Sequence, residues 1–281
     1  MTTVNPIPSP DTSHGLPGVS AAEVDAAMAY ETIFVPALFQ HWPEHVIAAA
    51  GVGPGHRTLD VACGTGVLTR ALPSVVGEIP APVGLDIAPG MLEVARRLNP
   101  DIQWRHGDAV ALPFEDASFD RVLCQYGLMF FPDRAVALRE MSRVLAAGGR
   151  LAVAVWDSLE NNPGFLEKVD ILDEAGGRAA GDALRAPFCL GDCEALHQLA
   201  EEAGLRGVKI TTRSGEARFS SMHEFVEAEV RGWLPVMGVQ LSEEQIETVH
   251  AECRRRLRRF ETRAGGELVL NTSAHILSAS V

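Results

Sequence analysis

An acidic residue followed by two glycines is the first pattern in this chain that could do chemistry. Thr58–Ala62 reads as an apolar strand that carries Asp60, and Gly64 and Gly66 follow in a turn that leads into a helix-compatible run. Glycine lets the backbone come close to a bound ligand because it has no Cβ. A carboxylate repels a diphosphate but can hydrogen-bond an ammonium or a hydroxyl group. The turn therefore suits a nucleoside carrying an amino acid better than a dinucleotide.

Three further polar residues stand at the ends of predicted strands. Asp86 comes about 20 residues after Gly64, the usual place for an acid that binds ribose hydroxyls. Asp108 follows the third predicted strand, and Gln125 ends the fourth. Because parallel strands bind ligands beyond their carboxyl ends, we expect Asp60, Asp86, Asp108 and Gln125 to converge on one cleft.

Neighbours of these acids complete a predicted nucleoside site. Ile87 and Met91 can offer apolar surface to an adenine ring. Asp108 can accept a hydrogen bond from an exocyclic amine, and the backbone N–H of Ala109 can serve a ring nitrogen.

The elements that must position these residues alternate along the chain. The predicted strands are Thr58–Ala62, Val83–Ile87, Ile102–His106, Arg121–Gln125 and Arg150–Trp156, and the predicted helices between them include 68–75, 91–98 and 135–145. Apolar strands that alternate with helices predict an α/β fold, a parallel sheet with helices on both faces.

Outside this region the pattern is looser. Residues 1–20 are rich in Pro, Ser, Thr and Gly and are predicted to form a flexible arm. Residues 21–281 are predicted to form a single domain, in which the stretches 21–50, 157–190 and 219–264 build a helical cap. Strand-like residues 208–212, 267–270 and 275–278 would complete the sheet.

Together these motifs resemble class I S-adenosylmethionine-dependent methyltransferases, in the small-molecule group that includes the ubiquinone and menaquinone C-methyltransferases. The likeness covers roughly residues 55–156 and is carried by the segments 59–66 (LDVACGTG), 84–92 (GLDIAPGML), 107–109 (GDA), 118–122 (SFDRV) and 140–150 (EMSRVLAAGGR). It implies a doubly wound, mostly parallel seven-stranded sheet of order 3-2-1-4-5-7-6, with strand 7 antiparallel.

The resemblance also implies roles for single residues. It assigns the methionine part of S-adenosylmethionine to Asp60, Ala62, Cys63, Gly64 and Gly66, the ribose to Asp86, the adenine to Asp108 and Ala109, and the sulfonium end to the backbone near Gln125. The product would be S-adenosylhomocysteine. Ala62 departs from the family pattern, because many members carry glycine there.

Aromatic side chains near the strand ends and in the cap predict an acceptor pocket. The candidate pocket walls are Tyr30, Phe34, Tyr126, Phe130 and Trp156. Such a pocket favours a small organic acceptor, a quinone-like molecule or another secondary metabolite. The cap histidines His41, His45, His223 and His250 could supply a general base, but the pattern selects none of them. Whether O, N, C or S receives the methyl group stays open.

Composition excludes several other partners. A net charge of −13 and a pI near 5.1 argue against nucleic acid, which is bound through Lys and Arg. No apolar run is long enough to span a membrane, and an odd set of five scattered cysteines predicts reduced thiols without a metal. We therefore expect a cytoplasmic protein, as a monomer or a homodimer.

Two alternatives stand beside methyl transfer. A nicotinamide-dependent oxidoreductase would need glycine at position 69, where this chain has Thr69, and would place Asp60 close to a diphosphate. A methyltransferase-like subunit that binds cofactor without turnover would keep the same cofactor motifs.

Overall fold

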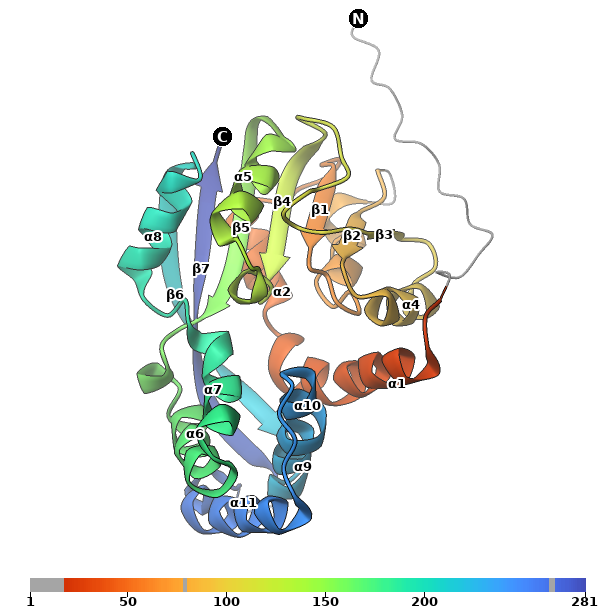
Figure 1. Ribbon diagram of the computed structural model, residues 1–281. Coiled ribbons are helices and arrows are strands. Elements are labelled where there is room, and N and C mark those ends of the chain that lie inside the picture. The colour runs from red at the N-terminus through yellow and green to blue at the C-terminus, as the bar shows by residue number, and fades with distance from the viewer. Residues whose placement is uncertain (1–17, 78–79, 263–265) are drawn as a thin grey trace, which may run out of the picture.

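The sheet follows the predicted order. The computed structural model describes residues 18–77, 80–262 and 266–281, and these form one seven-stranded sheet in the order β3-β2-β1-β4-β5-β7-β6 (Figure 1). All neighbouring strands from β3 to β5 run parallel, and β7 runs antiparallel to both β5 and β6. The strands are β1 Thr58–Val61, β2 Val83–Asp86, β3 Gln103–His106, β4 Phe119–Gln125, β5 Leu145–Trp156, β6 Arg206–Phe219 and β7 Leu268–Ser280.

Helices cover both faces of the sheet and build a separate lobe. The α-helices are α1 Ala21–Ala29, α2 Pro43–Ala50, α3 Pro73–Val76, α4 Pro89–Leu98, α5 Arg134–Arg143, α6 Pro163–Gly176, α7 Arg178–Arg185, α8 Cys193–Glu202, α9 Met222–Glu227, α10 Leu234–Val236 and α11 Glu243–Arg256. In Figure 1, α5 and α8 lie in front of the sheet and α2 behind it, while α6, α7, α9, α10 and α11 gather below it. We call this lower group the helical lobe.

Shorter helical turns join these elements. Two π-helical segments, η1 (Tyr30–Phe39) and η6 (Ala228–Trp233), continue α1 and α9 without a break. The 3-10 turns are η2 Thr69–Ala71, η3 Leu128–Phe130, η4 Leu159–Asn161, η5 Ala186–Phe188 and η7 Arg258–Phe260.

The ends of the helices follow from local sequence. Ser20 and Glu23 form a capping box that starts α1, and Ser242 and Gln245 form a second one that starts α11. Asp192 accepts two backbone hydrogen bonds at the start of α8. These residues satisfy backbone N–H groups that a helix cannot pair internally, so each helix begins at a defined residue.

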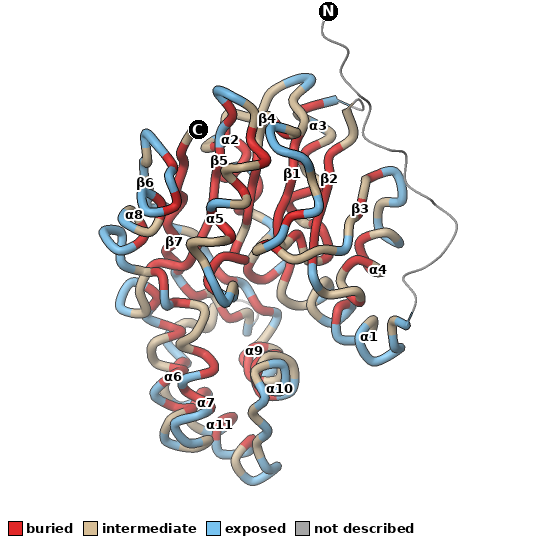
Figure 2. Tube along the Cα trace, turned by 45° about the horizontal axis from the view of Figure 1, so that its top comes forward, coloured by how far each residue is buried: buried red, intermediate tan, exposed pale blue. Residues whose placement is uncertain are grey.

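The core lies between the sheet and its helices. Every residue of β1 and β2 is buried, and Figure 2 shows buried segments concentrated in the central strands. The predicted strand at 208–212 is the middle of the 14-residue β6, which pairs along nearly its whole length with β7. β6 and β7 extend past the ends of the other strands and reach the helical lobe (Figure 1). This length was not apparent in the sequence, because β6 is mostly exposed and polar.

The predicted cap stretch 21–50 contains elements with different positions. Its first part, α1, packs against α4, whereas α2 packs against β4, β5 and β7 and so covers the sheet. Most of the predicted arm, residues 1–17, lies outside the described residues. The division of the chain into arm, domain and cap stays a prediction.

Packing at the β3-β2-β1 side of the sheet involves a tryptophan ring that lies against two glycines. The indole of Trp104 on β3 belongs to a small buried cluster with Cys63 and Leu92, and its Nε1 donates to the carbonyl of Asn99 at 2.8 Å. A Cβ at Gly84 would lie 2.6 Å from this ring, and one at Gly66 would collide with it. At Gly66 the missing side chain therefore makes room for Trp104.

Replacing Gly84 should expose this constraint. We expect Gly84→Ala to lower the free energy of unfolding by about 1–3 kcal/mol, because the fixed indole cannot move away from the added methyl group. Urea denaturation would measure the change. Gly53→Ala is the matched control, since its Cβ would meet only the ring of His56 at 3.7 Å and should leave stability nearly unchanged. Equal losses in both variants would contradict this packing account.

Candidate functional site

The predicted glycine turn joins β1 to the end of β2. The Asp86 carboxylate accepts hydrogen bonds from the backbone N–H of Gly64 at 2.7 Å and of Ala88 at 2.8 Å. Gly64 and Gly66 have positive φ values of 57° and 92°, which favour glycine. Ala62 also has φ 57°, so the chain holds alanine in a left-handed conformation that glycine adopts without strain.

Asp60 is a buried carboxylate, and one of its two oxygens has no hydrogen-bond partner in the described structure. Its Oδ2 accepts a hydrogen bond from Thr69 Oγ1 at 2.6 Å, whereas Oδ1 is buried and has no partner within the described part of the chain. Burial raises the pKa of Asp60 to about 7, because the charged form loses its hydration. An ammonium group of a ligand would satisfy Oδ1 and stabilise the charged carboxylate.

Hydrogen bonds of Glu31 join η1 to the glycine turn. Glu31 accepts hydrogen bonds from Thr65 Oγ1 at 2.5 Å and from Arg70 Nη2 at 2.6 Å. The neighbouring Tyr30 ring lies next to Gly64, where an added Cβ would approach the ring within 3.7 Å. The pKa of Tyr30 is raised by desolvation and then by the Asp86, Glu31 and Asp60 carboxylates. Tyr30 therefore lies between the acids and the space beyond them.

That space is an aromatic cavity of about 670 Å³, counted with its open mouth. The lining residues come from η1, the ends of β4 and β5, η3, η5, η6 and the helical lobe, and they are Tyr30, Phe34, Leu38, Phe39, Tyr126, Phe130, Trp156, Phe165, Leu184, Pro187, Phe188, Glu229 and Trp233.

Aromatic stacking holds the floor of this aromatic cavity. The rings of Tyr126 and Trp156 stack with their centroids 4.2 Å apart, and the ring centroid of Phe39 lies 5.4 Å from that of Tyr126. Tyr126 has φ 57° and a buried hydroxyl without a partner in the described structure. Strained residues of this kind persist where the surrounding structure fixes them, and they cluster at functional sites.

All five predicted pocket residues line this one cavity. Tyr30 and Phe34 come from η1, Tyr126 and Trp156 from strand ends, and Phe130 from η3. That they bind an acceptor stays a prediction. Sequence reasoning missed Phe39, Phe188, Trp233 and Glu229, which helical spacing did not place on the same surface.

The predicted cofactor residues lie at or near the ends of β1, β2, β3 and β4. Cys63 and Ala109 are buried, Ile87 is 60% exposed, and Met91 stands in the first turn of α4. Asp108 Oδ1 accepts a hydrogen bond from Val110 N–H, and Gln125 Nε2 donates to the Phe39 carbonyl. Their assignment to parts of the cofactor stays a prediction.

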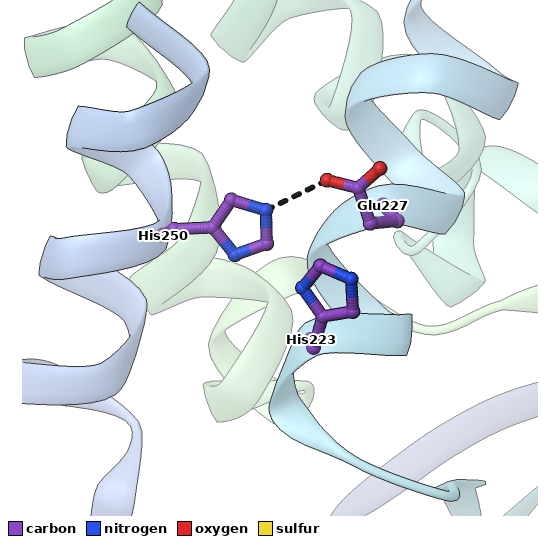
Figure 3. Close-up of side chains that lie close together, drawn as sticks. All are labelled: His223, Glu227 and His250. Atoms are coloured by element: carbon purple, nitrogen blue, oxygen red, sulfur yellow. Dashed lines mark hydrogen bonds and ion pairs between the residues drawn. The ribbon is translucent and has the colours of Figure 1, made fainter. Parts of the chain in front are cut away.

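Three side chains of the helical lobe could hold a metal ion. His223 and Glu227 on α9 and His250 on α11 place one possible ligand atom each within 4.8 Å of the others (Figure 3). Glu227 is already paired, with His250 Nε2 at 2.7 Å and with Arg231 Nε at 2.9 Å, and the two imidazoles stack at 5.0 Å. These contacts explain the cluster as a link between α9 and α11. The prediction that the protein binds no metal stays a prediction.

The four cap histidines do not line the aromatic cavity in the described structure. Within the described residues, no helix combines the length and the apolar character that crossing a membrane requires.

Comparison with known proteins agrees with this arrangement. The family model described as "Methyltransferase domain" matches residues 59–153. A demethylmenaquinone methyltransferase of Staphylococcus aureus (strain JH9) is 45% identical over 188 residues, which cover 62% of this chain and 78% of the relative. A second one, from Staphylococcus haemolyticus, is 36% identical over the same length and shares of both chains.

Solved structures show the same fold. YcgJ of Bacillus subtilis superposes with a TM-score of 0.58 at 19% identity, over 85% of this chain and 98% of YcgJ. The phosphoethanolamine N-methyltransferase 2 of Haemonchus contortus, solved with S-adenosyl-L-methionine, gives 0.57 at 17% identity, over 92% of this chain and 57% of that one.

The chain belongs to the class I S-adenosylmethionine-dependent methyltransferases. It is an enzyme of this class, and its methyl donor is S-adenosylmethionine. The predicted fold class and sheet order are confirmed. The nicotinamide alternative is thereby set aside.

We expect the buried Asp60 to lower the folding stability of the enzyme when no ligand is bound. As pH rises from about 4 to about 7, the unfolded chain loses the Asp60 proton while the folded chain keeps it, so folding stability falls. Asp60→Asn removes this loss. We expect the stability of the variant relative to wild type to grow by roughly 2–3 kcal/mol between about pH 5 and pH 8. Urea unfolding at several pH values would measure it. A difference that does not change with pH would contradict a raised pKa of Asp60.

Proposed function

We propose that this enzyme transfers the methyl group of S-adenosylmethionine to a small aromatic or quinone-like molecule held in the aromatic cavity. The observation that carries the proposal is the position of this cavity. Tyr30 lines it and also lies beside Gly64, so the cavity adjoins the glycine turn. The names of the Staphylococcus relatives, demethylmenaquinone methyltransferases, support an acceptor of this kind.

The residues at the strand ends fit the methyl donor. The unpartnered Oδ1 of Asp60 suits the ammonium group of its methionine part. Asp86, at the end of β2, would bind the ribose hydroxyls, and the exposed Ile87 beside it would pack against adenine. Asp108 and Ala109 would complete the adenine site, with Cys63, Gly64, Gly66, Met91 and the Gln125 backbone along the rest of the molecule.

The donor supplies a methyl group on a sulfonium, which is already activated toward displacement. The protein's own contribution is then alignment of the two reactants, worth about 7–11 kcal/mol in model reactions. The rings of Tyr126, Trp156 and Phe39 also exclude water from the place where the reactants meet.

Binding of S-adenosylhomocysteine tests the donor site. We expect micromolar affinity for wild type and a loss of about tenfold or more for Asp86→Ala, since hydrogen bonds to a charged partner contribute roughly 1.5–3 kcal/mol. Isothermal titration would measure both, and Asp101→Ala is a control in an exposed loop. Thermal unfolding must show that the variant is folded, because Asp86 also holds the Gly64 N–H. Unchanged affinity would refute the ribose contact.

A substitution at the mouth of the aromatic cavity tests the acceptor site. Phe130 lines the cavity and is 46% exposed, so Phe130→Asp should leave the fold intact. We expect KM for an aromatic acceptor to rise about tenfold or more, as an apolar contact is lost and a charge is added. Affinity for S-adenosylhomocysteine should stay unchanged. Val236→Asp, at an apolar residue that is 70% exposed outside the cavity, is the control. Equal KM values in both variants would place the acceptor elsewhere.

A further inference from the structure

Glu229 is the one charged side chain among the described residues that line the aromatic cavity. It is only 3% exposed, and its Oε2 is buried without a hydrogen-bond partner in the described structure. The other residues that line the cavity are aromatic or aliphatic. Burying a carboxylate among such groups is costly unless a partner satisfies it.

The nearest cation does not serve as that partner. Lys168 on α6 is fully buried, but its Nζ donates to the Phe225 carbonyl at 2.7 Å and lies 3.5 Å from the centre of the Phe225 ring. It acts on Glu229 through charge alone. A lysine held in this way stabilises a negative charge on Glu229 and leaves Oε2 free for a ligand.

The backbone around Glu229 is also unusual. Glu229 lies in the π-helical segment η6, and such segments occur often at functional sites. Two residues earlier, Glu227 is paired with His250 Nε2 (Figure 3) and also with Arg231 Nε. Trp233, at the end of η6, lines the same cavity and donates its Nε1 to the Ala183 carbonyl at 2.9 Å. Contacts of the neighbouring Glu227 and Trp233 therefore fix the backbone segment that carries Glu229.

We propose that Glu229 binds a hydroxyl group of the acceptor and takes up its proton during methyl transfer. This proposal rests on the proposed function and narrows the acceptor to a hydroxylated aromatic compound, such as a phenol or a hydroquinone. The acceptor oxygen, or the ring carbon that it activates, forms a bond to the methyl carbon. The bond between the methyl carbon and sulfur breaks with its electron pair left on sulfur, and the hydroxyl proton moves to Glu229 Oε2. Where the ring carbon is methylated, that carbon then loses its hydrogen as a proton to solvent and the oxygen takes the proton back from Glu229, which restores the aromatic ring.

Several titratable groups face this carboxylate. Lys168 approaches from α6 and Cys253 from α11, and the phenols of Tyr30 and Tyr126 line the same cavity. Burial raises the pKa of Glu229 above its ordinary 4.5, and Lys168 opposes this change. A raised pKa makes the carboxylate a stronger base. The pKa of Lys168 itself is lowered to about 8 by burial.

Two matched probes test the hydrogen bond directly. 1-Naphthol carries a hydroxyl group, and 1-methoxynaphthalene has the same rings without the donor. Each would be titrated into enzyme saturated with S-adenosylhomocysteine, for wild type, Glu229→Gln and the control Glu247→Gln on the exposed side of α11. We expect wild type and Glu247→Gln to prefer 1-naphthol about tenfold or more, as for a hydrogen bond to a charged acceptor.

The pH dependence separates a base from a packing residue. In wild type the preference for 1-naphthol should grow as the pH rises above the ordinary range of glutamate and Glu229 ionises, because burial raises the pKa of this carboxyl. Glu229→Gln should show a smaller preference that does not change with pH. Turnover of 1-naphthol should fall about 10²–10⁴-fold in Glu229→Gln with unchanged affinity for S-adenosylhomocysteine.

Three results would overturn the inference. They are equal affinity of wild type for the two probes, binding of neither probe, or a Glu229→Gln variant that keeps the wild-type preference and pH profile. Failure of S-adenosylhomocysteine to bind wild type would instead contradict the donor site, so the two proposals fail separately.

Discussion

The hydrogen bonds of the Asp86 carboxylate are the contacts on which the rest of the site depends. By accepting the Gly64 N–H, Asp86 fixes a turn in which Ala62, Gly64 and Gly66 all adopt positive φ. Such a turn is unfavourable by itself, because alanine resists this conformation and glycine loses the most entropy on folding. Holding it in place gives Tyr30 a surface to lie against and keeps Asp60 buried behind it.

Asp60 and Glu229 are buried carboxylates at the proposed donor and acceptor sites. Asp60 and Glu229 each have an oxygen without a partner in the described structure, and burial raises the pKa of both. A sequence selected only for stability would replace them with neutral or apolar side chains. Their presence is explained if each receives a ligand group, an ammonium at Asp60 and a hydroxyl at Glu229. Under the two proposals, ligand binding would offset the stability cost of these buried carboxylates.

The sequence predicted the sheet and the acids at its edge, because both depend on local patterns. Short apolar strands alternate with helices, and Asp60 and Asp86 stand at strand ends that topology brings together. The acceptor side was predicted only in part. Tyr30 and Phe34 were predicted as pocket walls, but Phe39 from the same segment was not, although it lines the same cavity. Glu229 gave no signal, because one glutamate in a polar stretch has no periodicity that shows its burial.

Phe39 reaches the cavity because of the π-helical geometry of η1. Pro36 has no N–H to donate within the helix, and beyond it the Gln40 N–H bonds to the Val35 carbonyl five residues back. The wider turn moves Phe39 onto the face that Tyr30 and Phe34 occupy. The second π-segment, η6, carries Glu229 and Trp233, which are four residues apart and line the same cavity. The position of Phe39 thus depends on a backbone irregularity, which regular periodicity cannot predict. Relatives could therefore change acceptor by changing these two segments while the strand ends that hold the donor stay the same.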